Sequence, residues 1–408
     1  MNILYINHYA GSLDMGMEFR PYYLAREWVR MGHNVRIVSA TYSHLRKQNP
    51  SIKKDFEIQM IDGIEYQWIK TCEYQGNGVA RAGTMFEFCG KLNLNASRIA
   101  KDFRPDAVIA SSTYPLDTYP AQRIAYLSGA ILIHEVHDMW PITLIELGGM
   151  SKTNPFVVLL QIAENSFCRH SDYVVSLLCA AKDYFIVHGM KAEKFRNVMN
   201  GIVLSEWESP EPLPPGHCDL LERLHKEGKF IICFFGSITK SYSIDYLIEA
   251  LRKIDNSNIA LVIVGEGNYK EEIIRQTEDL DYVFVLDKIN KAEIPTLLDN
   301  IDCCYVGALR NDMFRFGICM NKLFDSMMSG KPLLYAVEAP NNFVEDYGCG
   351  ISVAAEDSDA LAEGINKLLA CSDEQRAVMG SNGRKAVIEH YTYEKLAKQF
   401  IEIIEGRN

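Results

Sequence analysis

The feature that most constrains the fold of this chain is a pattern of short apolar runs that alternate with longer amphipathic segments. Runs rich in β-branched and aromatic residues are typical of buried strands, and the segments between them have helical spacing. This alternation predicts βαβ units around parallel sheets, and it occurs twice. The expected strands of the first series lie at residues 2–7, 35–40, 64–71, 106–111, 130–136 and 172–177, and those of the second at residues 229–236, 258–265, 281–287, 302–307, 331–337 and 350–355.

A proline-rich stretch separates the two series. Residues 204–218 contain four prolines and no periodicity, which is incompatible with a helix interior or a central strand. The predicted fold class is therefore α/β, with two Rossmann-like, doubly wound parallel-sheet domains that face each other across a cleft. The expected boundaries are an N-terminal domain at residues 1–205, a linker at 206–228, a C-terminal domain at 229–390, and a helix at 391–408 that packs back toward the first domain.

Charge narrows the choice of partners. The 408 residues include 42 Lys and Arg against 53 Asp and Glu, a net charge of −11, which disfavours binding to nucleic acid. The charge is unevenly distributed, because residues 1–200 carry a net +2 and the remainder a net −13. Residues 20–104 carry a net +6 and many aromatic side chains, which suits an anionic membrane surface. An ordinary solvated surface is the alternative interpretation.

The cysteine pattern and the hydropathy of the chain indicate the cellular compartment in which we expect the protein. The eleven cysteines form no CxxC pair, the N-terminus has no basic stretch followed by a long apolar segment, and no apolar run reaches the roughly 18 residues that span a bilayer. We therefore expect a reduced, cytoplasmic location, with any membrane association peripheral and at the inner face.

In the first domain, two loops that follow strands could carry chemistry. Gly11 and Gly16 precede a helix whose N-terminal amides could receive a phosphate, but their spacing is not GxGxxG. No acidic residue closes the second strand, which weighs against a nicotinamide or flavin enzyme. The fifth strand runs into EVHDMWP, so Glu135, His137 and Asp138 should project into the cleft. A buried structural histidine and a helix-capping aspartate are the alternatives.

In the second domain, the first two strands end in glycine-containing loops. Gly236 is followed by Ser237 and Lys240, which could surround a phosphate, although helix capping alone would explain the hydroxyl groups. Gly265 and Glu266 begin a tight turn that permits close approach of a ligand, or simply starts a helix.

The segment FRFGICMNKLFDSMMSGKP at residues 314–332 is the most informative. Asn321, Lys322 and Asp325 share one face of a short helix. Lys322 could neutralise a phosphate while Asp325 accepts both hydroxyls of a ribose, and a solvated ion pair is the alternative. Asp279-Leu280-Asp281 has the DxD form of a metal site but precedes a strand, so we expect no metal and no other cofactor.

These motifs together resemble glycosyltransferase family 4, retaining enzymes of the GT-B fold, along essentially the whole chain. The resemblance is closest to the bacterial branch that builds O-antigen, capsule or exopolysaccharide. It rests on a set of short matches, which are LAREWVRMGHNV, EVHDMWP, VMNGIVLSEW, VGEGN and FGICMNKLFDSMMSGKPLL.

The resemblance implies roles for matching residues. The first loop around Gly16 would approach the donor diphosphate, and His137 would face the transferred sugar. Asp325 would bind the donor ribose, with Lys322 near the phosphates. The remaining expected site residues are Asp138 as a catalytic group, Arg20 and Glu135 for the acceptor, and Gly236, Ser237, Lys240, Gly265, Glu266, Gly317 and Asn321 for the donor.

The sequence also departs from the family pattern. Gly317 stands where the family often has the first of two glutamates, and the second is the shorter Asp325. The usual Arg and Lys after the first strand of the second domain would fall on Ser237 and Tyr242, which leaves Lys240 as an approximate substitute.

The predicted function is transfer of a sugar from a nucleotide-diphosphate sugar, a UDP-sugar by preference, to a hydroxyl of a lipid-linked or saccharide acceptor, with retained anomeric configuration. A nucleotide-sugar 2-epimerase of the same architecture is the first alternative, and a nonenzymatic sugar-binding protein is the second.

Overall fold

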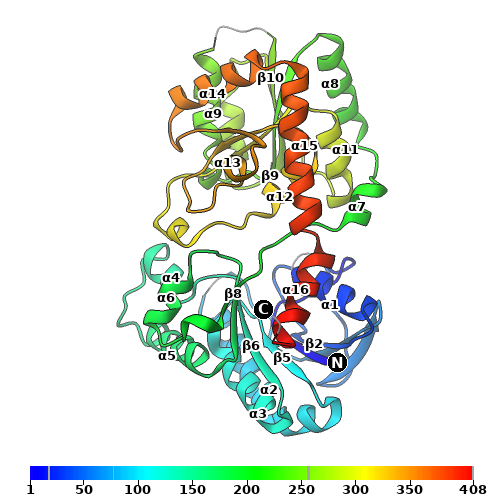
Figure 1. The fold of residues 1–408 in the computed structure, drawn as a ribbon, viewed down its shortest axis with the longest axis vertical. Helices are drawn as coiled ribbons and strands as arrows, with labels where there is room; N and C mark the ends of the chain where they lie inside the picture. The colour runs from blue at the N-terminus through cyan, green and yellow to red at the C-terminus, as the bar shows by residue number, and fades with distance from the viewer. Residues whose placement is uncertain (17–18, 77, 255–257, 407–408) are drawn as a thin grey trace. The chain divides into compact units, whose positions relative to one another are not determined.

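The computed structural model describes residues 1–16, 19–76, 78–254 and 258–406. The chain forms two compact units, and the first is discontinuous in sequence (Figure 1). Met1–Met199 and Tyr393–Asn408 make up the first unit, and Asn200–Thr392 makes up the second.

The first unit is built on an eight-stranded sheet in the order β3-β4-β2-β1-β5-β6-β7-β8. All neighbouring strands are parallel except β3 and β4, which form an antiparallel hairpin at the sheet edge. The strands are β1 (Asn2–Ile6), β2 (Asn34–Ala40), β3 (Glu57–Ile61), β4 (Ile64–Ile69), β5 (Ala107–Ala110), β6 (Ile131–Val136), β7 (Tyr173–Ser176) and β8 (Phe195–Asn197).

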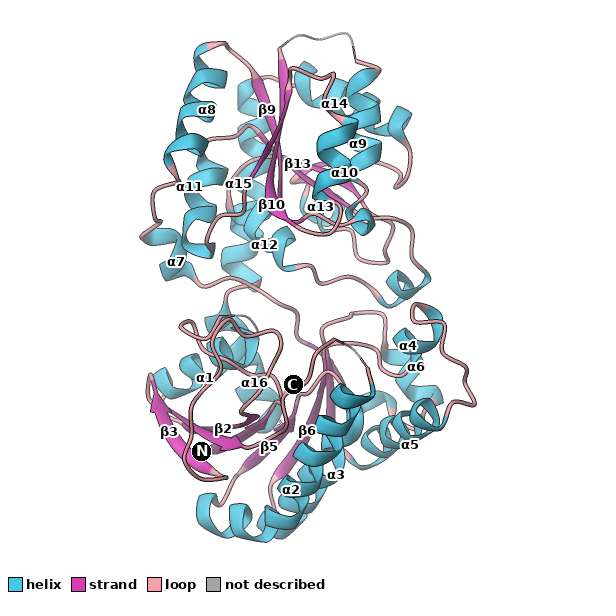
Figure 2. Ribbon diagram, turned by 180° about the vertical axis from the view of Figure 1, so that it is seen from behind, coloured by secondary structure: helices cyan, strands magenta, loops and turns pink. Residues whose placement is uncertain are grey.

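Helices cover this sheet and bury its apolar side chains. The long helix α2 and its neighbour α3 run side by side along the sheet (Figure 2), and their residues Leu92, Ile99 and Ile124 join Leu4 and Ile6 of β1 in one core. The helices are α1 (Phe19–Arg30), α2 (Val79–Phe103), α3 (Thr118–Ser128), α4 (Ile142–Glu146), α5 (Pro155–His170), α6 (Lys182–Val187) and α16 (Tyr393–Ile404), with 3-10 turns η1 (Pro115–Asp117) and η2 (Ala192–Lys194).

The C-terminal helix α16 completes the first unit by packing against α1 (Figure 1). The Trp28 indole Nε1 donates a hydrogen bond to the Ala397 carbonyl at 3.0 Å, and its ring meets the Phe400 ring edge-on with centroids 5.6 Å apart. The residues that share the α1 core are therefore supplied from opposite ends of the chain.

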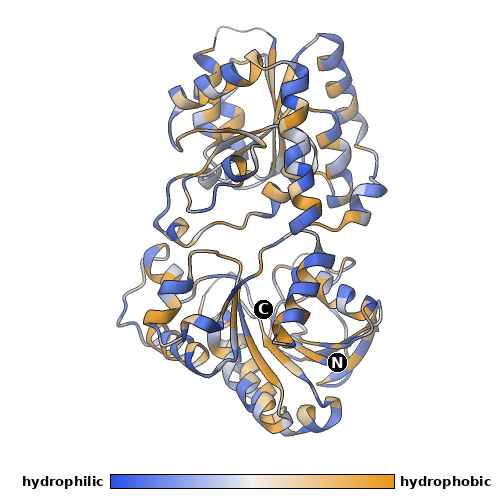
Figure 3. Ribbon diagram, in the orientation of Figure 1, coloured by the Kyte–Doolittle hydropathy of each residue, from blue (hydrophilic) through white to orange (hydrophobic). Residues whose placement is uncertain are grey.

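The second unit has a six-stranded, wholly parallel sheet in the order β11-β10-β9-β12-β13-β14. The central strands are apolar on both faces, as expected for a sheet covered by helices on both sides (Figure 3). The strands are β9 (Phe230–Ser237), β10 (Ile259–Glu266), β11 (Val283–Leu286), β12 (Cys303–Gly307), β13 (Leu333–Ala336) and β14 (Gly350–Ser352).

Most helices of the second unit lie between successive strands along the chain. They are α7 (Leu204–Glu208), α8 (Pro215–Lys226), α9 (Ile244–Arg252), α10 (Lys270–Gln276), α11 (Ile294–Asp299), α12 (Asn321–Met328), α13 (Phe343–Tyr347), α14 (Ser358–Ala370) and α15 (Asp373–His390), with 3-10 turns η3 (Lys240–Tyr242), η4 (Lys291–Glu293) and η5 (Asp312–Phe316).

The α/β fold class with two parallel-sheet domains is confirmed, and each of the twelve predicted strands is present within one to three residues at its ends. Within the predicted linker at 206–228, however, the structure has helix α8 and the end of α7. Helix formation is possible there because Pro215 occupies the first turn of α8, where its missing N–H costs no hydrogen bond.

Helices long and apolar enough to cross a bilayer are absent from the part of the chain that the structure describes.

Candidate active site

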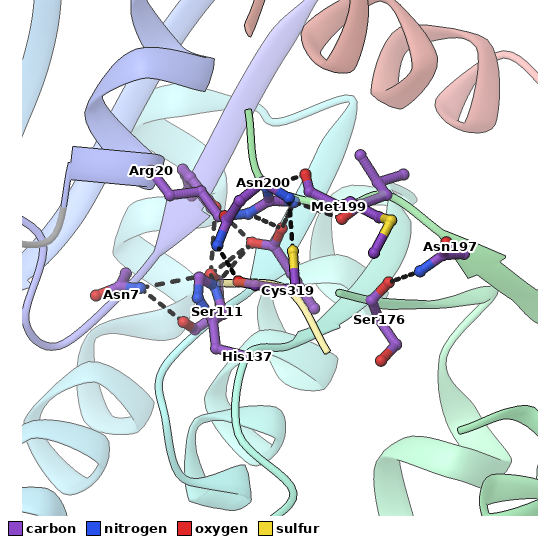
Figure 4. A network of polar contacts seen from close by, with 12 residues as sticks. Asn7, Arg20, Ser111, His137, Ser176, Asn197, Met199, Asn200 and Cys319 are labelled. Carbon is purple, nitrogen blue, oxygen red and sulfur yellow. Dashed lines mark hydrogen bonds and ion pairs between the residues drawn. The ribbon is translucent and has the colours of Figure 1, made fainter. Parts of the chain in front are cut away.

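The first unit holds a buried polar network at the carboxyl ends of β1, β5 and β6 (Figure 4). Its centre is the Glu135 carboxylate on β6, which is fully buried. Oε2 accepts hydrogen bonds from the Tyr5 hydroxyl and, at 2.7 Å, from the Ser111 hydroxyl. The Asn7 amide Nδ2 donates to the Ser111 carbonyl at 2.6 Å, which fixes the end of β5 against β1.

Arg20 of α1 neutralises this carboxylate. Its Nε and Nη2 donate to Glu135 Oε1 at 2.9 and 2.8 Å, in the two-pronged geometry that suits a guanidinium. The same side chain donates from Nη1 to the Met199 carbonyl at 2.6 Å and from Nη2 to the Val198 carbonyl at 2.9 Å. Arg20 thereby joins the first helix, the end of β6 and the segment after β8.

The charge state of the network follows from this pairing. Burial alone would raise the pKa of Glu135, but the adjacent Arg20 guanidinium outweighs that effect and holds the pKa well below its usual range. Burial, together with the Glu135 charge, raises the pKa of Tyr5 well above its usual value. At neutral pH the Glu135 carboxylate is therefore ionised and accepts hydrogen bonds from its neighbours.

His137 stands at the solvent side of this network. Its side chain is 12% exposed, and its Nε2 lies 2.8 Å from Ser111 Oγ and 3.2 Å from Glu135 Oε2. An ionised carboxylate at that distance favours a proton on Nε2 and stabilises the imidazolium when the ring is protonated. Asp138, the next residue, is exposed. Glu135 and His137 thus lie at the end of β6 and just past it, and the predicted roles of Glu135, His137 and Asp138 stay predictions.

Two sets of predicted site residues are buried. Arg20 and Glu135 are 5% and 0% exposed and are bonded to each other, and their predicted contact with an acceptor stays a prediction. Gly16 is buried and has a φ of +67°, and a Cβ there would lie 3.1 Å from the Lys47 side chain. The backbone conformation of this turn thus requires a glycine at position 16. The predicted contact of Gly16 with a donor stays a prediction.

The second unit has a candidate cluster of its own, where β9 ends at Gly236 and Ser237. Gly236 has a φ of +114°, which a side chain would oppose, and a Cβ built there would lie 3.5 Å from Lys322 Nζ. The Lys322 amine of α12 lies 3.3 Å from the centroid of the Tyr242 ring and 4.1 Å from that of Phe234. The Gly236 backbone, the Lys322 amine and these two aromatic rings form a cluster that we call the Lys322 recess.

The Lys322 amine has an unusual environment. Nζ is buried and has no hydrogen-bond partner among the residues that the structure describes, so only the two aromatic rings stabilise its charge. Burial lowers the pKa of Lys322 to about 7. An amine in this state gains from an anion placed over Gly236, because the anion would supply the missing partner.

The recess also explains an apparent substitution. The resemblance places a lysine at position 242, but this chain has Tyr242 there, and Lys240 was the expected substitute. Lys240 is exposed on η3, whereas Lys322 reaches the Tyr242 ring from a different element. The structure thus positions Lys322, and not Lys240, beside Gly236. Ser237 is exposed at the end of β9.

The last residues of β10 pair in register with those of β9. A Cβ at Gly265 would lie 1.9 Å from the Gly236 carbonyl oxygen, so only glycine allows this approach. Glu266 pairs in register with Ser237 and is exposed, and its carboxylate accepts from Lys270 Nζ at 2.8 Å. The glycine therefore serves the close approach of the two strand ends, and Glu266 lies at the exposed edge.

The α12 helix brings the remaining predicted residues to this edge. Asn321 is exposed in the first turn, and Asp325 follows Lys322 by three residues on the same side of the helix. Burial raises the pKa of Asp325 to about 6, against the influence of the Lys291 cation. Lys291 is itself paired with Glu206 at 2.9 Å.

The loop before α12 is fixed by hydrogen bonds within the second unit. Gly317 is buried and has a φ of +99°, and Asn341 bonds both the amide and the carbonyl of Ile318, at 2.9 and 2.8 Å. The Asn200 Nδ2 donates to the Cys319 carbonyl at 3.3 Å (Figure 4). This glycine shapes the loop, where the family often has a glutamate.

Sequence reasoning missed several residues of the two clusters. Ser111 follows β5 directly, so its place at a strand end was a usable signal. Tyr5 and Phe234 lie inside strands, where aromatic residues ordinarily mean core, and nothing in the sequence distinguished them. Asp279 of the DxD motif is occupied in a two-pronged ion pair with Arg252, at 2.6 and 2.7 Å.

Comparisons with known proteins bear on both units. A model described as "Glycosyl transferase 4-like domain" matches residues 15–201, and one described as "Glycosyl transferases group 1" matches residues 221–386. Together the two models match most of the chain.

Individual relatives agree with the models. The chain is 23% identical over 307 residues to the probable glycosyltransferase WbjE of Pseudomonas aeruginosa, and the match covers 71% of each chain. Among solved structures, Anabaena Alr3699/HepE in complex with UDP-glucose has a TM-score of 0.66 at 16% identity and full coverage of both chains. Sucrose-phosphate synthase from Thermosynechococcus elongatus has a TM-score of 0.72 at 16% identity, covering 100% of this chain and 99% of that one. With matching models over both units and this fold, the chain belongs to the glycosyltransferases, with a family 4-like N-terminal domain and a group 1 C-terminal domain.

Proposed function

We propose that this glycosyltransferase takes its sugar from a UDP-sugar bound at the Lys322 recess of the second unit. The observation that carries the proposal is the buried Lys322 amine beside Gly236, which lacks a hydrogen-bond partner among the described residues. A diphosphate over Gly236 would accept hydrogen bonds from this amine. The choice of uridine is supported by Anabaena HepE, a protein of the same fold whose structure holds UDP-glucose.

The recess suits departure of a diphosphate. Charge builds up on the leaving oxygens as the bond to the sugar breaks, and fixed donors in a desolvated site stabilise such charge better than water does. Lys322 would supply the positive charge, and the ionised Asp325 carboxylate would accept the two ribose hydroxyls. In this proposal the charge comes from protein groups, and neither a metal nor another cofactor takes part.

In the first unit, His137 would contact the transferred sugar and orient it or move a proton at the acceptor hydroxyl. Glu135 and Arg20 would keep its ring in one orientation, as the 3.2 Å contact of Nε2 with Glu135 suggests. Asp138, exposed beside it, would be the second polar group available to substrates. We propose attack from the face that the nucleotide leaves, with retained anomeric configuration, as the family resemblance implies.

The acceptor in this proposal is a lipid-linked or saccharide hydroxyl of bacterial surface polysaccharide synthesis. Support comes from the motif set and from the basic, aromatic stretch at residues 20–104, which would suit an anionic inner membrane face. Vesicle flotation at low salt tests the membrane part, because an enzyme that does not bind anionic liposomes has no such surface.

Thermal unfolding with UDP, GDP, dTDP and ADP tests the donor. We expect UDP to raise the Tm most, since a ligand that binds only the folded state stabilises it. Lys322→Met should abolish most of that shift while leaving the unliganded protein folded and at least as stable, because it removes a poorly solvated amine. Lys240→Met, an exposed lysine of the same unit, is the matched control and should respond like the wild type. An unchanged UDP shift in Lys322→Met would refute the recess as the donor site.

Product analysis separates the alternatives. An enzyme incubated with UDP-N-acetylglucosamine and no acceptor should leave the sugar configuration intact, whereas a 2-epimerase would convert it. Transfer that survives alanine at both His137 and Asp325 would show that the site is elsewhere. Free-sugar binding without nucleotide binding would favour the nonenzymatic alternative.

A further inference from the structure

A second pocket lies within the first unit, away from the His137 network. It has a volume of about 550 Å³ and is formed by α4, α5 and α6, together with the loop that precedes α5. Pockets of this size hold a single small ligand or one segment of a larger one. The proposed function leaves this pocket unused.

The exposed surface of the pocket is mainly apolar, although half of its ten lining residues are polar. Ile142 and Ile145 of α4 line it together with Val158 and Ile162 of α5, which are 42% and 54% exposed. Exposed aliphatic side chains gathered around a concave site mark a place where an apolar partner binds.

Three polar side chains of the lining are already bonded within the protein. The Gln161 amide Nε2 donates to Glu164 at 2.6 Å, and the Tyr184 hydroxyl donates to the same carboxyl group at 3.0 Å. His188 Nδ1 lies 2.8 Å from the Tyr184 carbonyl. A sugar or a nucleotide would have to compete for these groups, whereas an aliphatic chain needs none of them.

Glu164 lies behind the lining and adds no charge to it at neutral pH. It is 1% exposed, and burial raises its pKa to about 8, so the carboxyl group is largely protonated at pH 7. The lining also contains Glu146 and the exposed Lys152, whose charges are of opposite sign. The interior therefore favours an uncharged, apolar occupant.

The chain connects this pocket closely to the candidate catalytic residue. Ile142 is five residues after His137, and five Cα–Cα steps of 3.8 Å span at most about 19 Å. An amphiphile whose apolar part fills the pocket could thus present its polar end near His137. A bulk membrane lipid would gain nothing from that proximity, but an acceptor would.

We propose that the α4–α5–α6 pocket holds part of the hydrocarbon chain of a lipid-linked acceptor. This inference rests on the proposed function, since it names the class of acceptor for the same transfer. It selects the lipid-linked acceptor over the free saccharide, because a saccharide has no apolar segment to fill an aliphatic pocket.

Isothermal titration with farnesyl diphosphate, in the presence of saturating UDP to fill the donor recess, tests the pocket. Wild-type protein should bind the probe saturably, and inorganic diphosphate should not reproduce the binding. Ile162→Glu, a change at an exposed position, should weaken it at least tenfold. Leu94→Glu on α2 is the matched control, since Leu94 is 82% exposed in the same unit, and it should bind like the wild type.

Several outcomes would overturn the inference. The first is that the wild-type protein does not bind farnesyl diphosphate, and the second is that Ile162→Glu binds it equally well. The third is that Ile162→Glu keeps the probe and loses only its sedimentation with phosphatidylcholine–phosphatidylglycerol vesicles, which would indicate a general membrane surface. Wild-type dimers that Ile162→Glu dissociates, with no effect on the probe, would make the face a self-interface. Failure of the proposed function is distinguishable, because it would appear as loss of UDP-sugar binding while the Ile162-dependent binding of the probe persists.

Discussion

The charge of the Lys322 amine changes with pH near neutrality. In the ligand-free protein burial lowers its pKa to about 7, and a bound diphosphate would raise it again. Above pH 7 the free protein must therefore take up a proton on binding, so affinity falls as pH rises, approaching tenfold per pH unit. Burial also raises the pKa of Asp325 to about 6, and ribose binding needs the carboxylate, so affinity falls below pH 6 as well.

The expected result is a bell-shaped dependence of UDP-glucose affinity on pH, highest between pH 6 and 7, measured by titration calorimetry. UDP-glucose is the suitable probe because its diphosphate lacks the terminal phosphate ionisation near pH 6. Lys322→Arg should flatten the alkaline side, since arginine stays charged, and Asp325→Asn should flatten the acid side. A wild-type profile that is flat from pH 7 to 9 would contradict the assigned role of Lys322.

The Arg20–Glu135 pair supports a prediction about stability. Replacing Glu135 by Leu leaves the guanidinium buried without its carboxylate, which should lower the free energy of unfolding by about 3–5 kcal/mol. The double variant Arg20→Met/Glu135→Leu should lose less than the single variant, as measured by urea denaturation. Both should lose transferase activity, because His137 no longer has its carboxylate. Additive losses in the double variant would show that the two side chains act independently.

At this scale the sequence could predict positions but not pairings. Glu135 and His137 were predicted to lie at a strand end because a strand and the residues that follow it can be recognised from the local sequence. Arg20 meets Glu135 across 115 residues and Lys322 meets Tyr242 across 80, so both contacts depend on how the sheets assemble. The burial that changes the role of Arg20 and the pKa of Lys322 arises only from that assembly.

Among the elements, α16 supplies a test of the first unit. Phe400 is fully buried against Trp28 of α1, and truncating a buried phenylalanine to alanine typically costs about 3–5 kcal/mol. Phe400→Ala should therefore destabilise the first unit, seen as an earlier loss of tryptophan fluorescence in urea. Ile388→Ala on α15, at a 41% exposed position, is the control and should have little effect. Equal effects of the two changes would argue against packing of α16 on α1.

The elements that sequence analysis missed are short or polar. β3 alternates between half-buried and exposed residues and pairs with β4 through Asp62-Gly63, a two-residue turn with positive φ at both positions. An Asp-Gly turn between two runs is a recognised hairpin signal, so β3 could have been found. β8 has three residues, too few for any periodicity. Helix α8 begins at Pro215, the last of four prolines, and this proline-rich stretch was interpreted as a linker.

At the scale of the whole molecule, the two cores predict two unfolding steps. Trp28, Trp68 and Trp140 report on the first unit and Trp207 on the second. If UDP binds the second unit as proposed, UDP at a hundred times its Kd should stabilise that unit by about 2.7 kcal/mol and move only its transition. Phe400→Ala should move only the other. A single transition shifted equally by both would mean that the units unfold together.

The discontinuous first unit has a consequence for biosynthesis. Residues 1–199 leave the ribosome well before Tyr393–Asn408, so Trp28 stays without its partners while the whole second unit is made. At about 5–20 residues per second, the roughly 190 intervening residues take on the order of 10–40 s. During that interval the nascent first unit exposes the α1 face that α16 later covers. Of the two units, the one whose translation begins earlier is thus completed later, because its assembly awaits α16.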